Sequence, residues 1–475
     1  MKHVVVVGAG LAGLVTSTAL AQSGFGVTCV TFGVGGLPLS PGVVDHRVEG
    51  VSVAGGVSGG DASGILSPPC TLGPSYTGAP SDRSGDTPKP PLVENLPPDA
   101  PLSEAVPSIR HPARSVAESQ DLQSEAETLA RSCDFAQDDG TSHPYASIRA
   151  DTVLRGLELL LELAGPDLLI GDADTNVVLP TAVGAGRPTC LYPPSMVGGA
   201  SGGPAVIVGF KRLRDFYPEL IAGNCGARAA MVDVVARAGE VASSPMVFAR
   251  FFDTDAGRRA LVEALRPVVG DGETVGLPAV LGLDDLTAWR KVEDALEHPV
   301  FEIPFAPPSV PGWRLNNALV RAAQAAGVRF VRGVKAVGVE QANGRASGVV
   351  VTSAGSPTTL PADAVVLATG GLKSGGIVMD DHQCFTEPVM GLPLANIPDV
   401  PFVADVFAPQ PAYLVGARVD SAMHPLDDDG NIVCGNVHVV GGLIGGSDRV
   451  HELTNGGIDV GSAAAAVDVI EGELR

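Results

Sequence analysis

The chain has 475 residues, of which 60 are Gly and 39 are Pro, against an average usage of roughly 7% and 5%. Hydrophobic residues make up 45% of the sequence, which supplies a large core and excludes a wholly disordered chain. The formal net charge of −22 repels phosphate backbones and anionic bilayers, so nucleic acid is not an expected partner.

The seven Cys residues are dispersed, with no C-x-x-C pair and no cluster with His. This distribution predicts no metal site, either of zinc or of iron–sulfur type. An odd set of scattered thiols is typical of reduced cysteines, and we therefore expect a cytoplasmic protein.

From Val4 to Val44 no side chain is charged, a pattern shared with signal peptides and membrane spans. Gly, Ser and Thr residues interrupt the apolar run. We interpret it as a buried strand and helix, with a targeting segment as the alternative.

The first predicted unit is a strand over 4–7, a small-residue helix ending at Gln22, and a second strand over 27–31. Between the first strand and the helix stands a G-x-G-x-x-G motif, Gly8-Ala9-Gly10-Leu11-Ala12-Gly13. In this motif the first Gly permits a tight turn, the second lets the backbone approach a diphosphate, and the third lets helix and strand pack closely. The context predicts nucleotide binding by Gly8, Gly10, Leu11, Ala12 and Gly13. The alternative is a glycine-rich turn without a ligand.

The end of the second strand lacks the usual carboxylate that accepts the ribose hydroxyls. Thr31 stands there instead and can accept one hydrogen bond, but not a bidentate pair. This leaves open a flavin with a single phosphate.

Residues 55–143 differ from the rest in composition. They hold 12 of the 39 Pro, 13 Ser and two aromatic residues, with 13 acidic against five basic side chains. Such a segment buries too little apolar surface to order itself, so we expect a low-complexity, disordered insertion.

Regular structure is expected to resume near Pro144. Apolar spacing predicts a helix over 153–163, a buried strand over 205–209, and helices near 215–221 and 254–269, the last capped by Thr254 or Asp255. An amphipathic helix follows from Trp313 to Gly327, and then a strand over 328–331.

The apolar run over 364–368 is a predicted buried strand that ends in Thr369-Gly370-Gly371. It resembles the "ATG" segment of two-dinucleotide-domain flavoproteins. A second glycine-rich segment precedes an Ala-rich helix that is expected to point its N-terminus at the flavin pyrimidine edge. With Thr31 of the second strand, the cofactor-binding candidates outside the first motif are Thr31, Thr369, Gly370, Gly441, Gly442, Gly445 and Gly446.

These elements predict an α/β fold: a Rossmann-like flavoprotein with a parallel-sheet nucleotide-binding domain and an inserted mixed α/β domain. The expected boundaries give the nucleotide-binding domain three parts and place the other segments between them: nucleotide-binding at 1–54, 328–371 and 431–475; low-complexity insertion at 55–143; inserted α/β domain at 144–327; cap or substrate-side segment at 372–430.

Taken together, these segments resemble the B-subunit family of anaerobic glycerol-3-phosphate dehydrogenase. The resemblance follows the chain in order outside the insertion, and its motifs are the following: Val4 to Leu14, His143-Pro144-Tyr145, 205–210 (AVIVGF), 248–253 (FARFFD), 307–315 (PPSVPGWRL), 374–376 (SGG), 387–392 (EPVMGL), 407–411 (FAPQP) and 441–446 (GGLIGG). The insertion has no counterpart in the family, and the region 451–459 is more polar than the family's run of small residues.

The resemblance implies a flavin, FMN with FAD as the alternative, in a subunit that joins a catalytic A subunit and an iron–sulfur C subunit. That enzyme oxidises glycerol 3-phosphate to dihydroxyacetone phosphate and passes electrons to a quinone. The implied location is cytoplasmic, or peripheral on the inner face of the membrane through a partner, with no span of its own. Two other classes stay open: a non-catalytic structural partner that keeps the fold, and an independent FAD-dependent reductase.

The substrate phosphate requires a cation, and five basic residues lie in or beside the matched segments: Lys211, Arg212, Arg314, Arg418 and Arg449. Of these, Arg314 and Lys211 are the substrate candidates. Two histidines, His424 and His451, fall closest to the expected cofactor region, but sequence identifies no partner for either. We therefore assign no catalytic base.

Overall fold

The computed structural model describes residues 1–45 and 143–475, apart from 174, 201–202, 354, 450 and 453. The expected insertion at 55–143 falls outside the described residues, except for His143 at its end. The charge-free stretch up to Val44 supplies a buried strand–helix–strand unit. Within the described part of the chain, no helix combines the length and the hydropathy needed to cross a bilayer.

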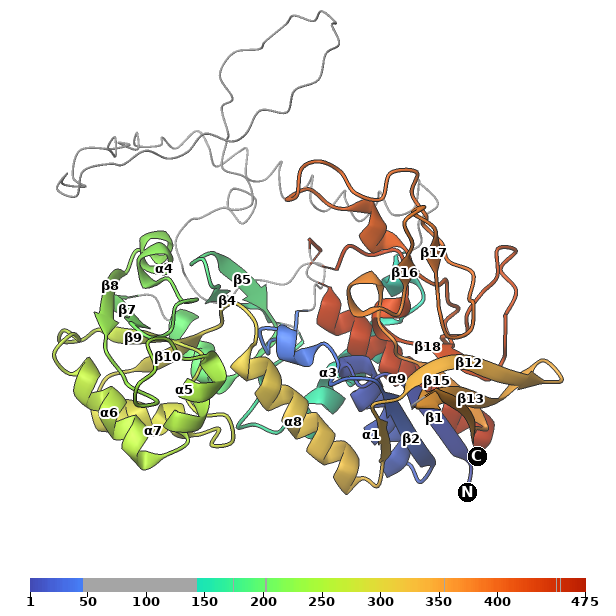
Figure 1. The fold of residues 1–475 in the computed structure, drawn as a ribbon, viewed down its shortest axis with the longest axis horizontal. Coiled ribbons are helices and arrows are strands. Elements are labelled where there is room, and N and C mark those ends of the chain that lie inside the picture. Colours follow the sequence, from blue (N-terminus) through green and yellow to red (C-terminus); the bar gives the residue numbers. More distant parts are fainter. Residues whose placement is uncertain (46–142, 174, 201–202, 354, 450, 453) are drawn as a thin grey trace, which may run out of the picture. The chain divides into compact units, whose positions relative to one another are not determined.

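A five-stranded parallel sheet forms the centre of the part expected to bind a nucleotide (Figure 1). The four valines of β1 are almost fully buried, because strands on both sides and helices around them leave no face to water. The sheet has the order β11-β2-β1-β15-β18, with β1 (His3–Val7), β2 (Gly26–Thr31), β11 (Arg329–Arg332), β15 (Ala364–Leu367) and β18 (Val437–Val439).

Several helices pack around this sheet and against one another: α1 (Leu11–Gln22), α3 (Ala150–Ala164), α8 (Val310–Ala325) and α9 (Asn455–Leu474). Close approach of α3 and α9 depends on small residues. A Cβ built at Gly156 lies 2.4 Å from the carbonyl oxygen of Val460, and one at Gly461 lies 2.8 Å from Val153 Cγ2. The Ala-rich composition of α9 is thus explained by its buried position between neighbouring helices.

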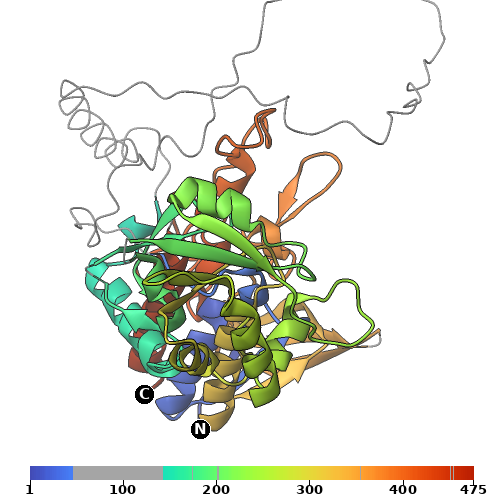
Figure 2. The ribbon, with the colours of Figure 1, turned by 90° about the vertical axis from the view of Figure 1, so that its left-hand side faces the viewer.

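A second parallel sheet, of order β10-β9-β7-β8, carries a separate hydrophobic core. Helix α4 lies on one face and α6 and α7 on the other, as right-handed crossovers require (Figures 1 and 2). Phe210, Phe248 and Phe252 pack together in this core, with ring centroids 5.3 to 5.9 Å apart. Its elements are β7 (Ala205–Phe210), α4 (Pro218–Cys225), β8 (Arg228–Val232), α5 (Pro245–Phe252), α6 (Asp255–Leu265), β9 (Thr274–Pro278), α7 (Ala288–Leu296) and β10 (Val300–Ile303).

The two parallel sheets have separate hydrophobic cores. The second core is built from residues between Val206 and Val310, whereas α3 and most of α8 contribute to the core of the first sheet. The expected inserted domain at 144–327 therefore encloses two helices that pack with the nucleotide-binding part.

The remaining strands are antiparallel and lie outside both parallel sheets. A three-stranded sheet connects β11 to β15, with strands β12 (Lys335–Ala342), β13 (Arg345–Ser353) and β14 (Ser356–Pro361). The others form short pairs: β3 (Ile170–Gly171) with β6 (Leu191–Tyr192), β4 (Val177–Pro180) with β5 (Gly186–Thr189), and β16 (Val378–Met379) with β17 (Phe385–Thr386). The α/β class and the parallel sheet expected from the sequence are confirmed.

Candidate functional site

The first segment of the site is the turn between β1 and α1. Gly8 has φ +117°, a conformation that side chains with a Cβ rarely adopt. A Cβ built there lies 2.1 Å from the carbonyl oxygen of Ala368, at the end of β15. The backbone of this turn is therefore pressed against the neighbouring strand, and only glycine fits.

The next two glycines have different roles. A Cβ built at Gly10 meets no heavy atom of the described residues within 4 Å, so the space in front of this residue is open. A Cβ at Gly13 lies 2.1 Å from the carbonyl oxygen of Gly8, so Gly13 permits close packing of α1 on the turn. Gly10 is the N-cap of α1, and none of the described side chains caps the helix. The amides of Leu11, Ala12 and Gly13, which have no intrahelical partner, thus face an open space with the positive end of the helix dipole.

The second segment follows β15. Thr369 has a buried hydroxyl oxygen with no hydrogen-bond partner among the described residues. Gly370 has φ +78°, and a Cβ built there lies 2.0 Å from Ser374 Oγ. A buried hydroxyl without a partner is destabilising, so Thr369 Oγ1 fits a position where a bound group completes the hydrogen bond.

The third segment follows β18 and meets the other two. A Cβ built at Gly442 lies 2.9 Å from the amide nitrogen of Gly371, and one at Gly441 lies 2.9 Å from Ala12 Cβ. Gly441 also donates its N–H to Ser462 Oγ of α9 at 2.9 Å. The carboxyl ends of β1, β15 and β18 therefore converge. We call the residues gathered there the glycine cluster: Gly8, Gly10, Gly13, Thr369, Gly370, Gly441 and Gly442.

The other two C-terminal glycines lie against a different segment. Gly445 donates its N–H to Ala417 O at 3.1 Å, and Gly446 donates to Leu414 O at 2.9 Å. The structure uses both for close backbone contact with residues 414–417.

Residues 44–45, from the N-terminal part of the chain, contact the first turn of α9. Gly457 donates its N–H to the carbonyl of Asp45 at 3.1 Å, and a Cβ at Gly456 lies 2.2 Å from Val44 Cγ1. Residues 44–45 therefore cover the N-terminal turn of α9, the turn that was expected to face the flavin pyrimidine edge.

An ion pair joins the glycine cluster to α9. Arg449 donates to Asp459 Oδ1 at 2.7 Å and to the carbonyl of Gly441 at 2.6 Å. Burial raises the pKa of Asp459, although Arg449 opposes the shift. Arg449 was a candidate from the sequence, but Asp459 and Ser462 were not, because no local spacing links α9 to the turn after β18.

The end of β2 lacks a carboxylate, and the structure places a cation opposite it. Thr31 Oγ1 donates to the carbonyl of Gly33 at 2.5 Å, which leaves its lone pairs as acceptors. Arg332 is the residue paired with Thr31 across β2 and β11, and its guanidinium lies 4.9 Å from the ring centroid of Phe330.

The two substrate candidates lie apart from the glycine cluster. Arg314 is 4% exposed and forms a bidentate pair with Glu302, at 2.7 and 3.0 Å, while its Nε donates to Gly282 O at 2.7 Å. This geometry ties Arg314 into the second core. Lys211 is exposed and directly follows β7, in the other parallel sheet.

Two groups that can carry positive charge lie beside the second segment. Lys373, in the turn that follows Gly371, has its ammonium 3.9 Å from the ring centroid of Tyr413, and burial lowers its pKa. His451 pairs with Asp448 at 2.7 Å and with the carbonyl of Phe407 at 3.0 Å. Burial opposes protonation of His451, but these two partners raise its pKa overall, and Lys373 is close enough to counteract them in part. No local pattern pointed to Lys373, which needs the fold to bring it near residues 448–451.

Comparison with known proteins gives a family model described as "FAD binding domain", which matches residues 108–458. Relatives named as the B subunit of anaerobic glycerol-3-phosphate dehydrogenase include the following two. That of Halobacterium salinarum, whose name is qualified as probable, is 31% identical over 346 residues, covering 68% of this chain and 81% of that protein. That of Yersinia pestis is 27% identical over 353 residues, covering 70% and 82%.

Among solved structures, a 3-ketosteroid-delta4-(5alpha)-dehydrogenase from Rhodococcus jostii matches with a TM-score of 0.32 and 12% identity. The match covers 98% of this chain and 97% of that one.

Proposed function

The chain belongs to the FAD-binding-domain family and, within it, to the B-subunit family of anaerobic glycerol-3-phosphate dehydrogenase; on this premise we propose that it is the flavin-carrying B subunit of such a dehydrogenase. It takes part in the oxidation of glycerol 3-phosphate to dihydroxyacetone phosphate. The observation that carries the proposal is the glycine cluster, where three strand ends meet and Gly10 leaves open space before the amides of α1.

The residues of the cluster fit a flavin nucleotide. The amides of Leu11 and Ala12 would hold a phosphoryl group of the cofactor. Thr369 Oγ1, which has no hydrogen-bond partner among the described residues, would form a hydrogen bond with the bound cofactor. We propose FAD, because the matching family model describes an FAD-binding domain, and keep FMN as the alternative that the missing carboxylate beside Thr31 suggested. A bidentate ribose contact is absent at that position, so the adenosine part of FAD depends on backbone groups and on Thr31.

A bound flavin would supply the acceptor for the hydride that leaves the alcohol carbon. The chain's own residues bind and orient the substrate. Lys373 lies beside the turn after Thr369 and carries positive charge that a phosphate monoester needs, whereas both ring nitrogens of His451 are already bonded, to Asp448 and to the carbonyl of Phe407. Arg314 is less suited to this task, because Glu302 and Gly282 already occupy its guanidinium.

Partner subunits follow from the family. We propose that this chain associates with a catalytic A subunit and an iron–sulfur C subunit, and that the C subunit passes electrons to a quinone. By the same resemblance, we propose contact with the inner face of the membrane through that partner.

The experiment is to purify the full chain alone and together with the A and C subunits. Flavin released from the protein by denaturation is identified by chromatography against FAD and FMN. The visible absorption of the bound flavin is then followed after anaerobic addition of glycerol 3-phosphate, with glycerol as the control ligand.

Each outcome selects one function. Bleaching of flavin held by this chain, alone or in the complex, supports the proposed function. A chain that holds no flavin but binds the A subunit is a structural partner. A chain that binds FAD tightly, and whose flavin is reduced by NAD(P)H but not by glycerol 3-phosphate in any assembly, is an independent reductase.

A further inference from the structure

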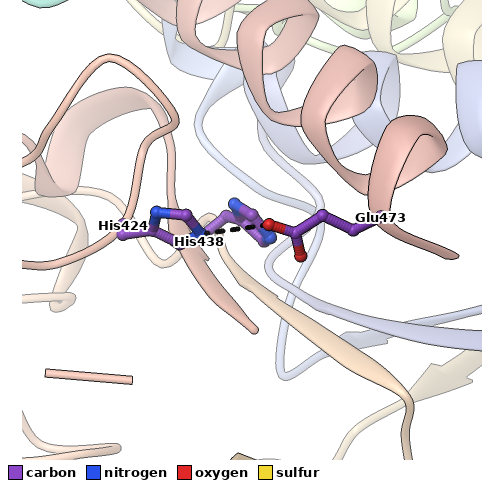
Figure 3. A group of neighbouring side chains, drawn as sticks. All are labelled: His424, His438 and Glu473. Carbon is purple, nitrogen blue, oxygen red and sulfur yellow. Dashed lines mark ion pairs between the residues drawn. The ribbon is translucent and has the colours of Figure 1, made fainter. Parts of the chain in front are cut away.

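A second group of side chains lies at the far end of α9 from the glycine cluster. His424, His438 and Glu473 each offer one ligand atom, and these atoms all lie within 4.8 Å of one another (Figure 3). The three residues come from different parts of the fold. His438 is the middle residue of β18, His424 belongs to the preceding turn, and Glu473 is in the last turn of α9.

His438 has one ring nitrogen fixed by the backbone. It is 0% exposed, and its Nδ1 lies 3.0 Å from the carbonyl oxygen of Ala422. Because a carbonyl oxygen only accepts, Nδ1 carries the proton and Nε2 holds a lone pair. This Nε2 is buried and has no hydrogen-bond partner among the described residues.

His424 is arranged in the same way. It is 7% exposed, and its Nδ1 lies 3.0 Å from Asp420 Oδ2, so Nδ1–H donates to a carboxylate. Its Nε2 is also buried, finds no hydrogen-bond partner in the described part of the chain, and lies 3.8 Å from Glu473 Oε1. That separation is too long for a hydrogen bond. The two imidazole rings stand 4.9 Å apart between centroids.

Two buried imidazole nitrogens therefore lack a hydrogen-bond partner among the described residues, and His424 Nε2 lies within ion-pair distance of Glu473 (Figure 3); a cation bound between the two nitrogens and the carboxylate satisfies all three groups. Metal-binding histidines have this design: one nitrogen donates to a carboxylate or a backbone carbonyl, which fixes the tautomer and turns the other nitrogen toward the metal. Asp420 and the carbonyl of Ala422 provide these outer contacts here.

We propose that His424 Nε2, His438 Nε2 and the Glu473 carboxylate bind a divalent transition-metal ion, with zinc as the fitting member of the class. Two imidazoles and one carboxylate suit zinc and leave the fourth tetrahedral position for water. Ligands of a tetrahedral zinc stand about 3.4 Å apart for bonds of about 2.0–2.1 Å. Glu473 is 39% exposed and on the last helical turn, so its side chain is free to close the remaining gap.

The position of the site indicates a structural role. Glu473 is 11 residues beyond Ser462, the α9 residue that bonds Gly441, which is about 16 Å along the helix at about 1.5 Å per residue. A metal there ties the end of α9 to β18 and to the 420–424 turn. This inference does not depend on the proposed function, because none of its ligands belongs to the glycine cluster.

The test is a zinc titration of the full chain after chelator treatment and dialysis. Isothermal calorimetry with zinc sulfate, and metal analysis by mass spectrometry, are run on wild type, Glu473→Gln and His438→Gln. Glu471→Gln, on the same turn of α9, and His382→Gln, at an exposed position, are the matched controls. Melting temperature with and without zinc gives a second readout.

We expect one zinc per chain for wild type and for both controls, and a rise in melting temperature on zinc addition. Loss of a ligand should weaken binding by on the order of 100-fold or more, and Asp420→Asn by about 10- to 100-fold. Because Glu473 is partly exposed, its variant keeps the test valid even where His438→Gln fails to fold. The proposal is overturned by a wild-type chain that binds no zinc, or by a Glu473→Gln chain that binds it as tightly as Glu471→Gln does.

Discussion

Replacing Gly10 by valine separates cofactor binding from folding. Gly10 has φ −78° and ψ −172°, an extended conformation open to any residue, and a Cβ built there meets no described heavy atom within 4 Å. We therefore expect Gly10→Val to fold, with a loss of no more than about 1 kcal/mol because valine is a poorer N-cap residue than glycine. Its two methyl groups, however, fill the space in front of the amides of Leu11 and Ala12.

The size of the effect follows from the hydrogen bonds that are lost. Bonds from backbone amides to a charged phosphate contribute about 1.5–3 kcal/mol each. If the valine displaces the phosphate from two amides, binding weakens by ~3–6 kcal/mol. Since ~1.4 kcal/mol corresponds to a factor of ten, the dissociation constant for the flavin rises at least ~100-fold.

The assay compares flavin content after purification, the dissociation constant from fluorescence titration of flavin-free protein, and the urea midpoint. Gly223→Val is the matched control, because Gly223 is an exposed residue of α4 whose Cβ also meets nothing within 4 Å among the described residues. A Gly10→Val protein that folds normally and keeps full flavin occupancy would falsify the placement of the phosphate at the α1 amides.

Three further changes test other parts of the structure. Gly13→Ala places a Cβ 2.1 Å from Gly8 O and should lower stability by about 1–3 kcal/mol in urea unfolding; an unchanged midpoint contradicts the close packing of α1. Glu302→Gln leaves the Arg314 guanidinium buried without its charge partner and should cost about 3–5 kcal/mol in the same assay, while a neutral effect counts against a structural pair. The pKa of His451 is raised above the ordinary value of 6.5, so its protonation stabilises the fold below pH 6.5, and this stabilisation is lost as pH rises through the folded pKa. The difference in unfolding free energy between wild type and His451→Gln should therefore shrink with rising pH. A difference that stays constant with pH refutes the pairing with Asp448.

The N-terminal unit was predictable because its information is local. Four consecutive valines, the glycine spacing and the end of the helix near Gln22 lie within 31 residues, and each predicts one backbone feature that the structure contains. The same holds for Thr254, whose side chain accepts from the Gly257 amide at 3.1 Å as the N-cap of α6. Short-range rules of capping and periodicity are sufficient in such segments.

The site's assembly was not predictable, because it depends on strands far apart in sequence. Residues 370–371 touch residues 441–442 only because β15 and β18 are neighbours in the sheet. Arg314 was a plausible anion ligand by its motif, but the sequence could not show that Glu302, on β10, would neutralise it. A cation and its partner on separate elements leave no periodic signal.

The sequence predicted no metal site for the same reason, since His424, His438 and Glu473 have no ligand-like spacing. The two proposed sites share β18 and α9 but lie at different ends of α9, so their tests are independent. Glu473→Gln should leave flavin occupancy unchanged, because the first turn of α9 is held by its own bond from Gly457 to Asp45. Gly10→Val should in turn leave zinc binding unchanged, because α1 supplies none of the metal ligands. If Glu473→Gln released both flavin and zinc, the end of α9 would have to control the strand ends through β18, and the two sites would form a single coupled unit.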